Sequence, residues 1–374
     1  MCYNKTMLYF DNAATTKISK SSLEEYVKTS EWFFNPSSLY AESSKAKALI
    51  EESRSCILKQ LKGKLKSTLI FTGCATESNN AVLNAHITRK DKKYIFSAGE
   101  HSSVYETAKK YQEKSYNIVF VPLNKNGSVN VDALMSELDN TVALVSIIYV
   151  SNETGAINDI KSITEQVKEF NKNIIVHTDG VQALAKVDIN LKDLGVDYFT
   201  MSAHKINGPK GIGALYIAEP NKFKPFIIGG GQEMNLRAGT ENIPAICAFR
   251  KAVEDIKIKN FSKHKKAILE NLKGDYVLVS DDNCADNIIS ICFKGVRGET
   301  ILHMLEEKGY LIGTGSACNS KAGLNRVLST IVSKDYIEGT IRISFDDSVS
   351  VEDCANLGKE LTNAVKVYIE RIRK

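Results

Sequence analysis

The chain has 374 residues, of which 43% are hydrophobic and 25% are charged, and its formal net charge is +5. This balance excludes disordered and fibrous proteins, and a mild excess of basic residues spread along the whole chain does not indicate direct nucleic-acid binding. The length predicts two domains, and because about 18 apolar residues never follow one another, no contact with a membrane is expected.

Residues 1–11 lack the basic start and apolar stretch of a secretory signal, so we expect a cytoplasmic protein. The eight cysteines form no CxxC pair, and in a reducing compartment most should be free thiols. None of the six histidines stands near a second ligand at a spacing typical of zinc sites, so no metal site is expected.

Seven short apolar or β-branched segments recur in the first two thirds of the chain, separated by stretches with a helical pattern. They are residues 68–71, 94–97, 118–121, 142–150, 174–177, 198–201 and 214–217. Strands that alternate with helices favour a parallel sheet with helices on both faces. We therefore predict an α/β fold with a mostly parallel seven-stranded sheet.

The pattern changes after about residue 250, where a lysine-rich helix precedes apolar segments at 287–293, 310–312 and 340–345 and a terminal helix. This mixture predicts a smaller α+β domain. The expected division is a large domain of residues 15–250 and a small domain made of residues 1–14 and 251–374.

Polar and small residues follow five of the predicted strands, where an open α/β sheet binds its ligands. One of them is Lys205, at the end of the segment SAHK. A lysine amine that is desolvated there can form a Schiff base with pyridoxal phosphate (PLP). A solvated surface lysine is the common alternative.

Companions of this lysine strengthen the cofactor hypothesis. The pyridine nitrogen of PLP calls for a facing carboxylate, and Asp179 follows a predicted strand, although an Asp there can also cap a helix. Gln182, three residues later, could reach the phenolic oxygen of the ring. His101 follows another strand and could stack on the ring and shuttle protons, but a histidine with a purely structural role is more common.

The phosphate of PLP needs backbone N–H groups and hydroxyls at the start of a helix. Residues 73–78, which include Ala75 and Thr76, supply both after a predicted strand, and Ser202 and His204 could add side-chain donors. Such a turn is a weak signal by itself.

Two residues of the C-terminal part complete the predicted site. Cys318 lies in a small-residue loop, which offers access to a nucleophilic thiol, whereas most other cysteines should be buried and inert. Arg342 lies in a predicted strand with an alternating pattern, and its guanidinium could bind a substrate carboxylate through two hydrogen bonds. A surface salt bridge is the alternative.

Taken together, these segments resemble the NifS/IscS-type cysteine desulfurases, which belong to the class V aminotransferase group of fold-type I PLP-dependent transferases. The resemblance runs nearly end to end. It rests on residues 11–16 (DNAATT), 35–38 (NPSS), 75–78 (ATES), 100–101 (EH), 152–155 (NETG), 177–182 (HTDGVQ), 202–205 (SAHK), 208–211 (GPKG), 229–232 (GGGQ), 237–242 (RAGTEN) and 315–318 (GSAC).

The resemblance implies a PLP-dependent enzyme that removes sulfur from L-cysteine and leaves L-alanine and a persulfide on Cys318. In such an enzyme Lys205 and His101 move protons, while Asn152 and Arg342 bind the substrate carboxylate. Ten residues would contact the cofactor: Ala75, Thr76, His101, Asn152, Asp179, Gln182, Ser202, His204, Lys205 and, reaching the phosphate of the other subunit, Thr240.

The partners that the resemblance implies are a second copy of the chain and a sulfur-acceptor protein for iron–sulfur cluster assembly or tRNA thiolation. Two departures from the family pattern stand out. Cys74 replaces a small glycine in the phosphate turn, and residues 319–328 look shorter than usual and lack the Ser-His-Val or Ser-Tyr-Val ending. A shorter loop predicts delivery to a particular scaffold or tRNA-thiolation protein.

Other functions compete with this hypothesis. A selenocysteine lyase shares the fold and is hard to separate by sequence, whereas an aminotransferase for small amino acids does not explain Cys318. A non-catalytic scaffold would not need Lys205, Asp179, His101 and Cys318 together. A nicotinamide dehydrogenase is disfavoured because no G-x-G-x-x-G follows a strand.

Overall fold

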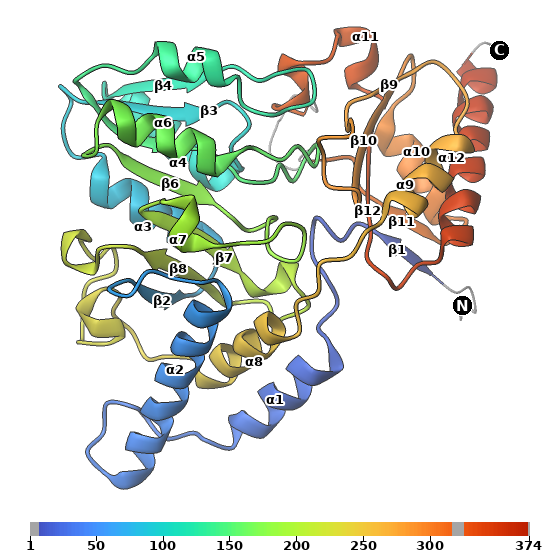
Figure 1. The fold of residues 1–374 in the computed structure, drawn as a ribbon. Helices are drawn as coiled ribbons and strands as arrows, with labels where there is room; N and C mark the ends of the chain where they lie inside the picture. Colours follow the sequence, from blue (N-terminus) through green and yellow to red (C-terminus); the bar gives the residue numbers. More distant parts are fainter. Residues whose placement is uncertain (1–6, 316–324, 373–374) are drawn as a thin grey trace.

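Two bodies of secondary structure form the part of the chain that the computed structural model describes, residues 7–315 and 325–372. Figure 1 shows a large sheet with helices on both faces in one body, and a smaller sheet beside the long C-terminal helix in the other. In the described ranges no helix has both the length and the apolar run that a bilayer crossing needs.

The large sheet has seven strands in the order β2-β8-β7-β6-β5-β3-β4. All neighbours are parallel except that β8 runs antiparallel to β2 and β7. The predicted mostly parallel seven-stranded sheet is therefore confirmed. The strands are β2 (Thr68–Thr72), β3 (Lys93–Ser97), β4 (Asn117–Val121), β5 (Val142–Ser146), β6 (Ile175–Asp179), β7 (Tyr198–Ser202) and β8 (Gly213–Ile217).

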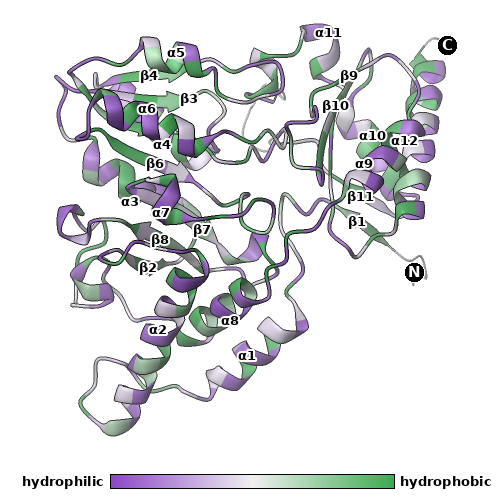
Figure 2. Cartoon of the chain, viewed as in Figure 1, coloured by the Kyte–Doolittle hydropathy of each residue, from purple (hydrophilic) through white to green (hydrophobic). Residues whose placement is uncertain are grey.

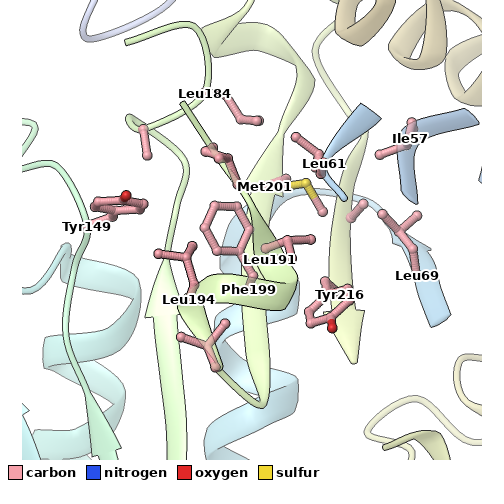
Figure 3. Packing of buried hydrophobic residues seen from close by; sticks show 14 of the residues in the cluster. Ile57, Leu61, Leu69, Tyr149, Leu184, Leu191, Leu194, Phe199, Met201 and Tyr216 are labelled. Carbon is pink, nitrogen blue, oxygen red and sulfur yellow. The ribbon is translucent and has the colours of Figure 1, made fainter. Parts of the chain in front are cut away.

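Both faces of this sheet are buried, which explains why its strands read as nearly continuous apolar runs. Side chains alternate between the faces: Phe199 and Met201 of β7 pack in one cluster, whereas Tyr198 packs in another. Figure 3 shows the first cluster around Phe199. The helices of this body are α1 (Lys20–Ser30), α2 (Ala41–Gln60), α3 (Ala75–His86), α4 (Ser102–Glu113), α5 (Val131–Ser136), α6 (Ile160–Phe170), α7 (Leu191–Leu194) and α8 (Ile243–Glu254).

Most of these helices begin where a polar side chain accepts a hydrogen bond from the first turn, as Asp159 does from Ser162 N (3.0 Å) at α6. Helix α3 differs, because Cys74 at its N-cap makes no such bond. The start of α3 thus keeps backbone donors that no capping side chain satisfies.

The second body contains a three-stranded antiparallel sheet, β12-β10-β9, and a parallel pair, β1-β11. Its own apolar cluster includes Phe10, Ile289 and Leu361. Figure 2 shows hydrophilic and hydrophobic residues alternating along its long helix α12, as an amphipathic helix requires. The elements are β1 (Leu8–Phe10), α9 (Ser262–Glu270), β9 (Tyr276–Leu278), β10 (Ile288–Phe293), α10 (Gly298–Glu306), β11 (Tyr310–Ile312), α11 (Lys334–Ile337), β12 (Thr340–Ser344) and α12 (Val351–Ile372).

Strand β5 is shorter than the predicted strand 142–150 because it ends at Ser146. Beyond that point the amide of Ile148 no longer pairs with β3 but donates to the carboxylate of Glu100 (2.6 Å). The chain therefore leaves the regular ladder at the carboxyl end of the sheet, where the predicted site residues lie.

Candidate active site

Lys205 lies in the short 3-10 helix η1 (Ala203–Lys205), directly after β7. Its Nζ donates to the backbone oxygens of Ala13 (2.6 Å) and Ala14 (2.7 Å). Burial, and after it the charge of Arg342, lowers the pKa of the Lys205 ammonium to about 8. The unprotonated fraction of this amine near neutral pH is therefore larger than that of an exposed lysine, which favours a nucleophilic role.

The backbone that receives Lys205 belongs to residues 11–14, which we call the crossing segment because it connects β1 of the second body to the large body. Asn12 N donates to Ser344 O (3.0 Å), and Ala13 N donates to Ser344 Oγ (2.9 Å). The crossing segment is thus held from the side of β12 as well as from Lys205.

Asp179 ends β6, the strand next to β7, and is buried. Its Oδ1 accepts from Val181 N (3.0 Å), and its Oδ2 accepts from Asn79 Nδ2 (2.8 Å). One carboxylate oxygen thus supports the turn after the strand and the other binds α3. No helix begins at Asp179, because residues 181–187 form turns and a bend, so the helix-cap alternative is wrong and the contact with the ring nitrogen stays a prediction.

Asn79 connects Asp179 to His101 through Ser103, because Asn79 Nδ2 also donates to Ser103 Oγ (2.8 Å), which lies 2.8 Å from His101 Nδ1. Ser103 N donates to the same ring nitrogen (3.2 Å), which assigns the ring proton to Nε2. Although His101 is exposed, the protein around its ring desolvates it enough to lower the pKa of the imidazole. The lowered pKa favours the neutral imidazole, which can accept a proton from a neighbouring group.

Gln182 is buried between β6 and the crossing segment. Its Nε2 donates to Ala13 O (2.8 Å), the same oxygen that accepts from Lys205. Its Oε1 has no hydrogen-bond partner within the described ranges. A buried amide oxygen without a partner is rare in folded proteins and marks a place where a ligand's polar atom would be stabilised.

The predicted phosphate turn lies beside the end of β7. Ser202 pairs with Gly213 of β8, and a Cβ at Gly213 would lie 2.8 Å from Cys74 C and 3.0 Å from Ala75 N. Only glycine permits this close approach. As first residues of α3, Ala75 and the exposed Thr76 have amides without an intrahelical acceptor, so the helix start can bind an anion.

Two further predicted phosphate ligands lie at different places. His204 Nδ1 lies 3.1 Å from Thr15 Oγ1, and burial, followed by the charge of Lys205, lowers the pKa of His204 to about 4. Thr240 is exposed and lines a cavity of about 160 Å³ together with Gly73 of its own chain. Its predicted contact with the phosphate of another subunit remains a prediction.

Arg342 extends from β12 into the space between the bodies and is buried. Its Nη2 donates to Asp11 Oδ1 (2.8 Å), and its Nη1 donates to the backbone oxygen of Asn152 (3.0 Å). Its Nε has no partner among the residues that the structure describes. A substrate carboxylate that binds here would compete with Asp11 for the guanidinium of Arg342 and could accept a hydrogen bond from its Nε.

Glu153 connects Asn152 to Arg342. Its Oε1 accepts a hydrogen bond from Asn152 Nδ2 (2.7 Å) and lies 3.9 Å from Arg342 Nη1. The other oxygen, Oε2, accepts from Asn325 Nδ2 (2.6 Å). Glu153 therefore holds both predicted ligands of the substrate carboxylate.

Cys318, the predicted sulfur acceptor, lies outside the described residues. Cys74 is exposed at the N-cap of α3. Of the described cysteines, four are buried, as Cys247 is.

The structure brings Lys205, Asp179, Gln182, His101, Asn152 and Arg342 to one region between the carboxyl ends of the strands and β12. Sequence reasoning overlooked three groups that hold them, namely Asn79, Asp11 and Glu153. Asp11 and Glu153 lie inside motifs that were recognised, so a search for carboxylates within those motifs could have found both. Asn79 carried no signal of its own.

Comparison with known proteins gives the same assignment over most of the chain. A profile of the family described as Aminotransferase class-V matches residues 8–357. A protein named cysteine desulfurase IscS from Dictyoglomus turgidum is 35% identical, over 93% of this chain and 92% of its own length. A protein named NifS/IcsS homolog from Lactobacillus delbrueckii is 36% identical, over 93% and 94%.

Solved structures are similar as well. One described as a NifS-like protein superposes with a TM-score of 0.87 at 31% identity, covering 97% of this chain and 100% of its own. Another, described as SspA in complex with cysteine, has a TM-score of 0.79 at 29% identity and covers 90% of this chain and 98% of its own.

Proposed function

The chain belongs to the class-V aminotransferase family as a cysteine desulfurase of the NifS/IscS type, and from this premise we propose that its site removes sulfur from L-cysteine with pyridoxal phosphate as cofactor. The observation that carries the proposal is the meeting of the desolvated Lys205 and the buried Asp179 at the ends of adjacent strands. A PLP site requires a lysine that gives up its proton more readily than an exposed one and a carboxylate that can face the ring nitrogen.

The residues present fit this cofactor. The uncapped start of α3, with Ala75 and Thr76, would hold the phosphate next to Ser202, with His204 nearby. Asp179 would face the pyridine nitrogen, and the free amide oxygen of Gln182 supports its proposed contact with the ring. His101 would lie against the ring face. Bound through Lys205, PLP withdraws electrons from the α-carbon of an amino acid and so weakens its bonds.

The protein's own groups would do the rest. Arg342 and Asn152 would hold the carboxylate of L-cysteine, while Lys205 and the neutral His101 would pass protons to and from its carbons. The thiolate of Cys318 would attack the substrate sulfur, forming an S–S bond as the C–S bond breaks. The electron pair left on carbon would take a proton, which gives L-alanine and an enzyme persulfide.

The proposal includes a homodimer in which Thr240 of each chain reaches the phosphate of the other. An exposed cluster of aromatic rings supports an assembly: Phe33, which is 82% exposed, stacks on Phe34, which in turn meets Tyr40 edge to face. Size-exclusion chromatography tests this, and a monomeric profile at micromolar concentration would contradict the dimer.

The domain division belongs to the proposal too, with residues 15–250 in the large domain and residues 1–14 and 251–374 in the small one. Its support is the pairing of β1 with β11 and the packing of Phe10 in the second apolar cluster. The sulfur would pass from Cys318 to an acceptor protein, either an iron–sulfur scaffold or a tRNA-thiolation enzyme.

The decisive experiment measures alanine and sulfide release from L-cysteine with a reductant, for the yellow wild type, Lys205→Ala and Cys318→Ala. We expect equal amounts of both products from the wild type and neither from the variants, while Cys318→Ala keeps its yellow colour. A yellow wild type that acts only on L-selenocysteine would identify a selenocysteine lyase instead. A colourless wild type would contradict the cofactor itself.

A further inference from the structure

Arg326 of the C-terminal body donates hydrogen bonds to the loop that precedes His101. Its Nη1 donates to the backbone oxygen of Ala98, and its Nη2 donates to that of Glu100. The guanidinium also lies 3.7 Å from the centre of the Tyr105 ring on α4. Contacts with two carbonyl oxygens and one aromatic ring fix the position and the orientation of the planar guanidinium. A lysine ammonium could not make the same set of contacts.

One of the two hydrogen bonds of Arg326 is to the peptide group that joins Glu100 to His101. The backbone oxygen of Glu100 and the backbone nitrogen of His101 belong to the same peptide group. The guanidinium of Arg326 therefore fixes the position of the backbone from which the His101 side chain extends. Behind the loop, the buried side chain of Glu100 accepts from Ile148 N (2.6 Å). The loop is therefore fixed by the large body on one side and by Arg326 on the other.

The neighbouring residue, Asn325, binds the second part of the site. Its Nδ2 donates to Glu153 Oε2 (2.6 Å), and its Oδ1 accepts from Leu328 N (3.0 Å), which fixes the amide orientation. The opposite oxygen of Glu153 accepts from Asn152 Nδ2 (2.7 Å). Asn325 thus acts on Asn152 through a single buried carboxylate.

Asn325 and Arg326 lie within residues 319–328, the stretch that lacks the Ser-His-Val or Ser-Tyr-Val ending expected from the family resemblance. A serine is too short to span to Glu153 in the way that the longer Asn325 amide does, and neither histidine nor tyrosine has the fork of Arg326.

We propose that Asn325 and Arg326 are positioning residues of the reaction, with Arg326 aligning His101 for proton transfer and Asn325 aligning Asn152 for binding of the substrate carboxylate. The inference rests on the proposed function. Because different groups are aligned, the two residues control different constants: Arg326 acts on kcat and Asn325 acts on KM. A merely structural tie between the bodies would alter both constants together.

The test compares holoenzymes of the wild type, Arg326→Met, Arg326→Lys and Asn325→Ser, with Arg297→Met as the matched control, since Arg297 is exposed. Rates of alanine release are expressed per bound PLP, which removes any loss of folded protein. Arg326→Met should lower kcat by about 10- to 100-fold, part of the usual contribution of a proton-transfer group, with KM nearly unchanged. Arg326→Lys should recover only a small part of the kcat that Arg326→Met loses.

Asn325→Ser should raise KM for L-cysteine about tenfold, the size of one hydrogen bond to a charged group, with little change in kcat. Arg297→Met should match the wild type. Equal changes of kcat and KM in both variants would overturn the proposal.

Amide hydrogen exchange gives a second readout that needs no turnover. In Arg326→Met, residues 98–104 should exchange about tenfold faster, while β6 and β7 exchange as in the wild type. An unchanged rate in 98–104 would also overturn the proposal. If the wild type released no alanine, the proposed function would fail, and this exchange measurement alone would decide whether Arg326 positions the His101 loop.

Discussion

The body built on the seven-stranded sheet and the C-terminal body supply the site in different ways. In the first, Asp179 ends β6 and Lys205 lies in the short helix after β7, so the hydrogen bonds of the sheet set their positions. The second reaches the same place through long side chains, such as that of Arg342, which Asp11 holds beside β1 and which bonds the backbone oxygen of Asn152 in the sheet body. The sheet body provides fixed chemistry, and the second body provides alignment that single substitutions can remove.

The largest loss of stability should come from breaking the buried ion pair inside the sheet body. Arg54 Nη1 lies 2.8 Å from Glu233 Oε2, and that oxygen also accepts from Phe71 N (2.8 Å). Arg54→Met leaves a buried carboxylate unpaired, so we expect the free energy of unfolding to fall by about 3–5 kcal/mol. Urea unfolding measures it.

Arg89→Met is the matched control, since the ion pair of Arg89 with Asp91 is exposed, and it should unfold at the wild-type urea concentration. A similar midpoint for both variants would show that the Arg54 pair contributes no more than a surface contact.

Matched cavities in the two apolar clusters test whether the bodies are separate folding units. Leu191 of α7 and Leu361 of α12 are both fully buried, in different clusters. Each leucine-to-alanine change should cost about 2–5 kcal/mol, but in different unfolding transitions. Calorimetry would resolve them, and one shared transition shifted equally by both variants would argue against the proposed domain division.

The third prediction removes the contribution of the second body to substrate binding. Arg342→Met removes the guanidinium that would bind the substrate carboxylate, and truncating one partner of a desolvated charge pair costs about 2–5 kcal/mol. We expect kcat/KM for L-cysteine to fall by about 100-fold, while the yellow colour of the holoenzyme persists because Lys205 and Asp179 belong to the sheet body. Loss of colour in this variant would contradict the division of roles.

The smallest effect concerns the pH dependence of cofactor capture by the apoprotein. Only the unprotonated Lys205 amine attacks an aldehyde, and its pKa is lowered to about 8 by burial and by Arg342. The rate of colour formation on adding PLP should therefore rise about tenfold per pH unit below about pH 8 and level off above it. A rise that continues to about pH 10 would mean that the lysine titrates like an exposed one.

The lowered pKa also fixes the sign of the contribution of Lys205 to stability. Between about pH 8 and the ordinary lysine value, the unfolded chain binds more protons than the folded one, so the free energy of unfolding should rise with pH through that window. Urea midpoints of the wild type and Lys205→Met across the window measure this term, which should vanish in the variant.

Much of the fold could be predicted because strands buried on both faces leave long apolar runs in the sequence. The reversal of β8 could not, because its residues 213–217 read like those of a parallel strand, and only the short connection after η1 forces the antiparallel pairing. Likewise, strand 142–150 was predicted too long, because its apolar pattern continues after Glu100 has taken the amide of Ile148.

The chemistry of the site was easier to predict than its support. Lys205, Asp179 and His101 lie in recognisable short motifs, so the sequence alone is enough to propose them as site residues. The contacts of Asn79 with Asp179 and of Arg326 with the His101 loop join residues 100 or more positions apart, and no local pattern encodes such pairings.

The crossing segment ties the beginning of the chain to its end. Strand β1 pairs with β11, placing Leu8 opposite Tyr310, and Ala13 binds both Ser344 and Lys205. On a ribosome that adds about 5–20 residues per second, β1 would wait roughly 15–60 s for its partner strand. The sheet body can fold during that wait, so the surroundings of the reactive lysine are completed last, and a truncated nascent chain should gain its sheet before it can hold PLP.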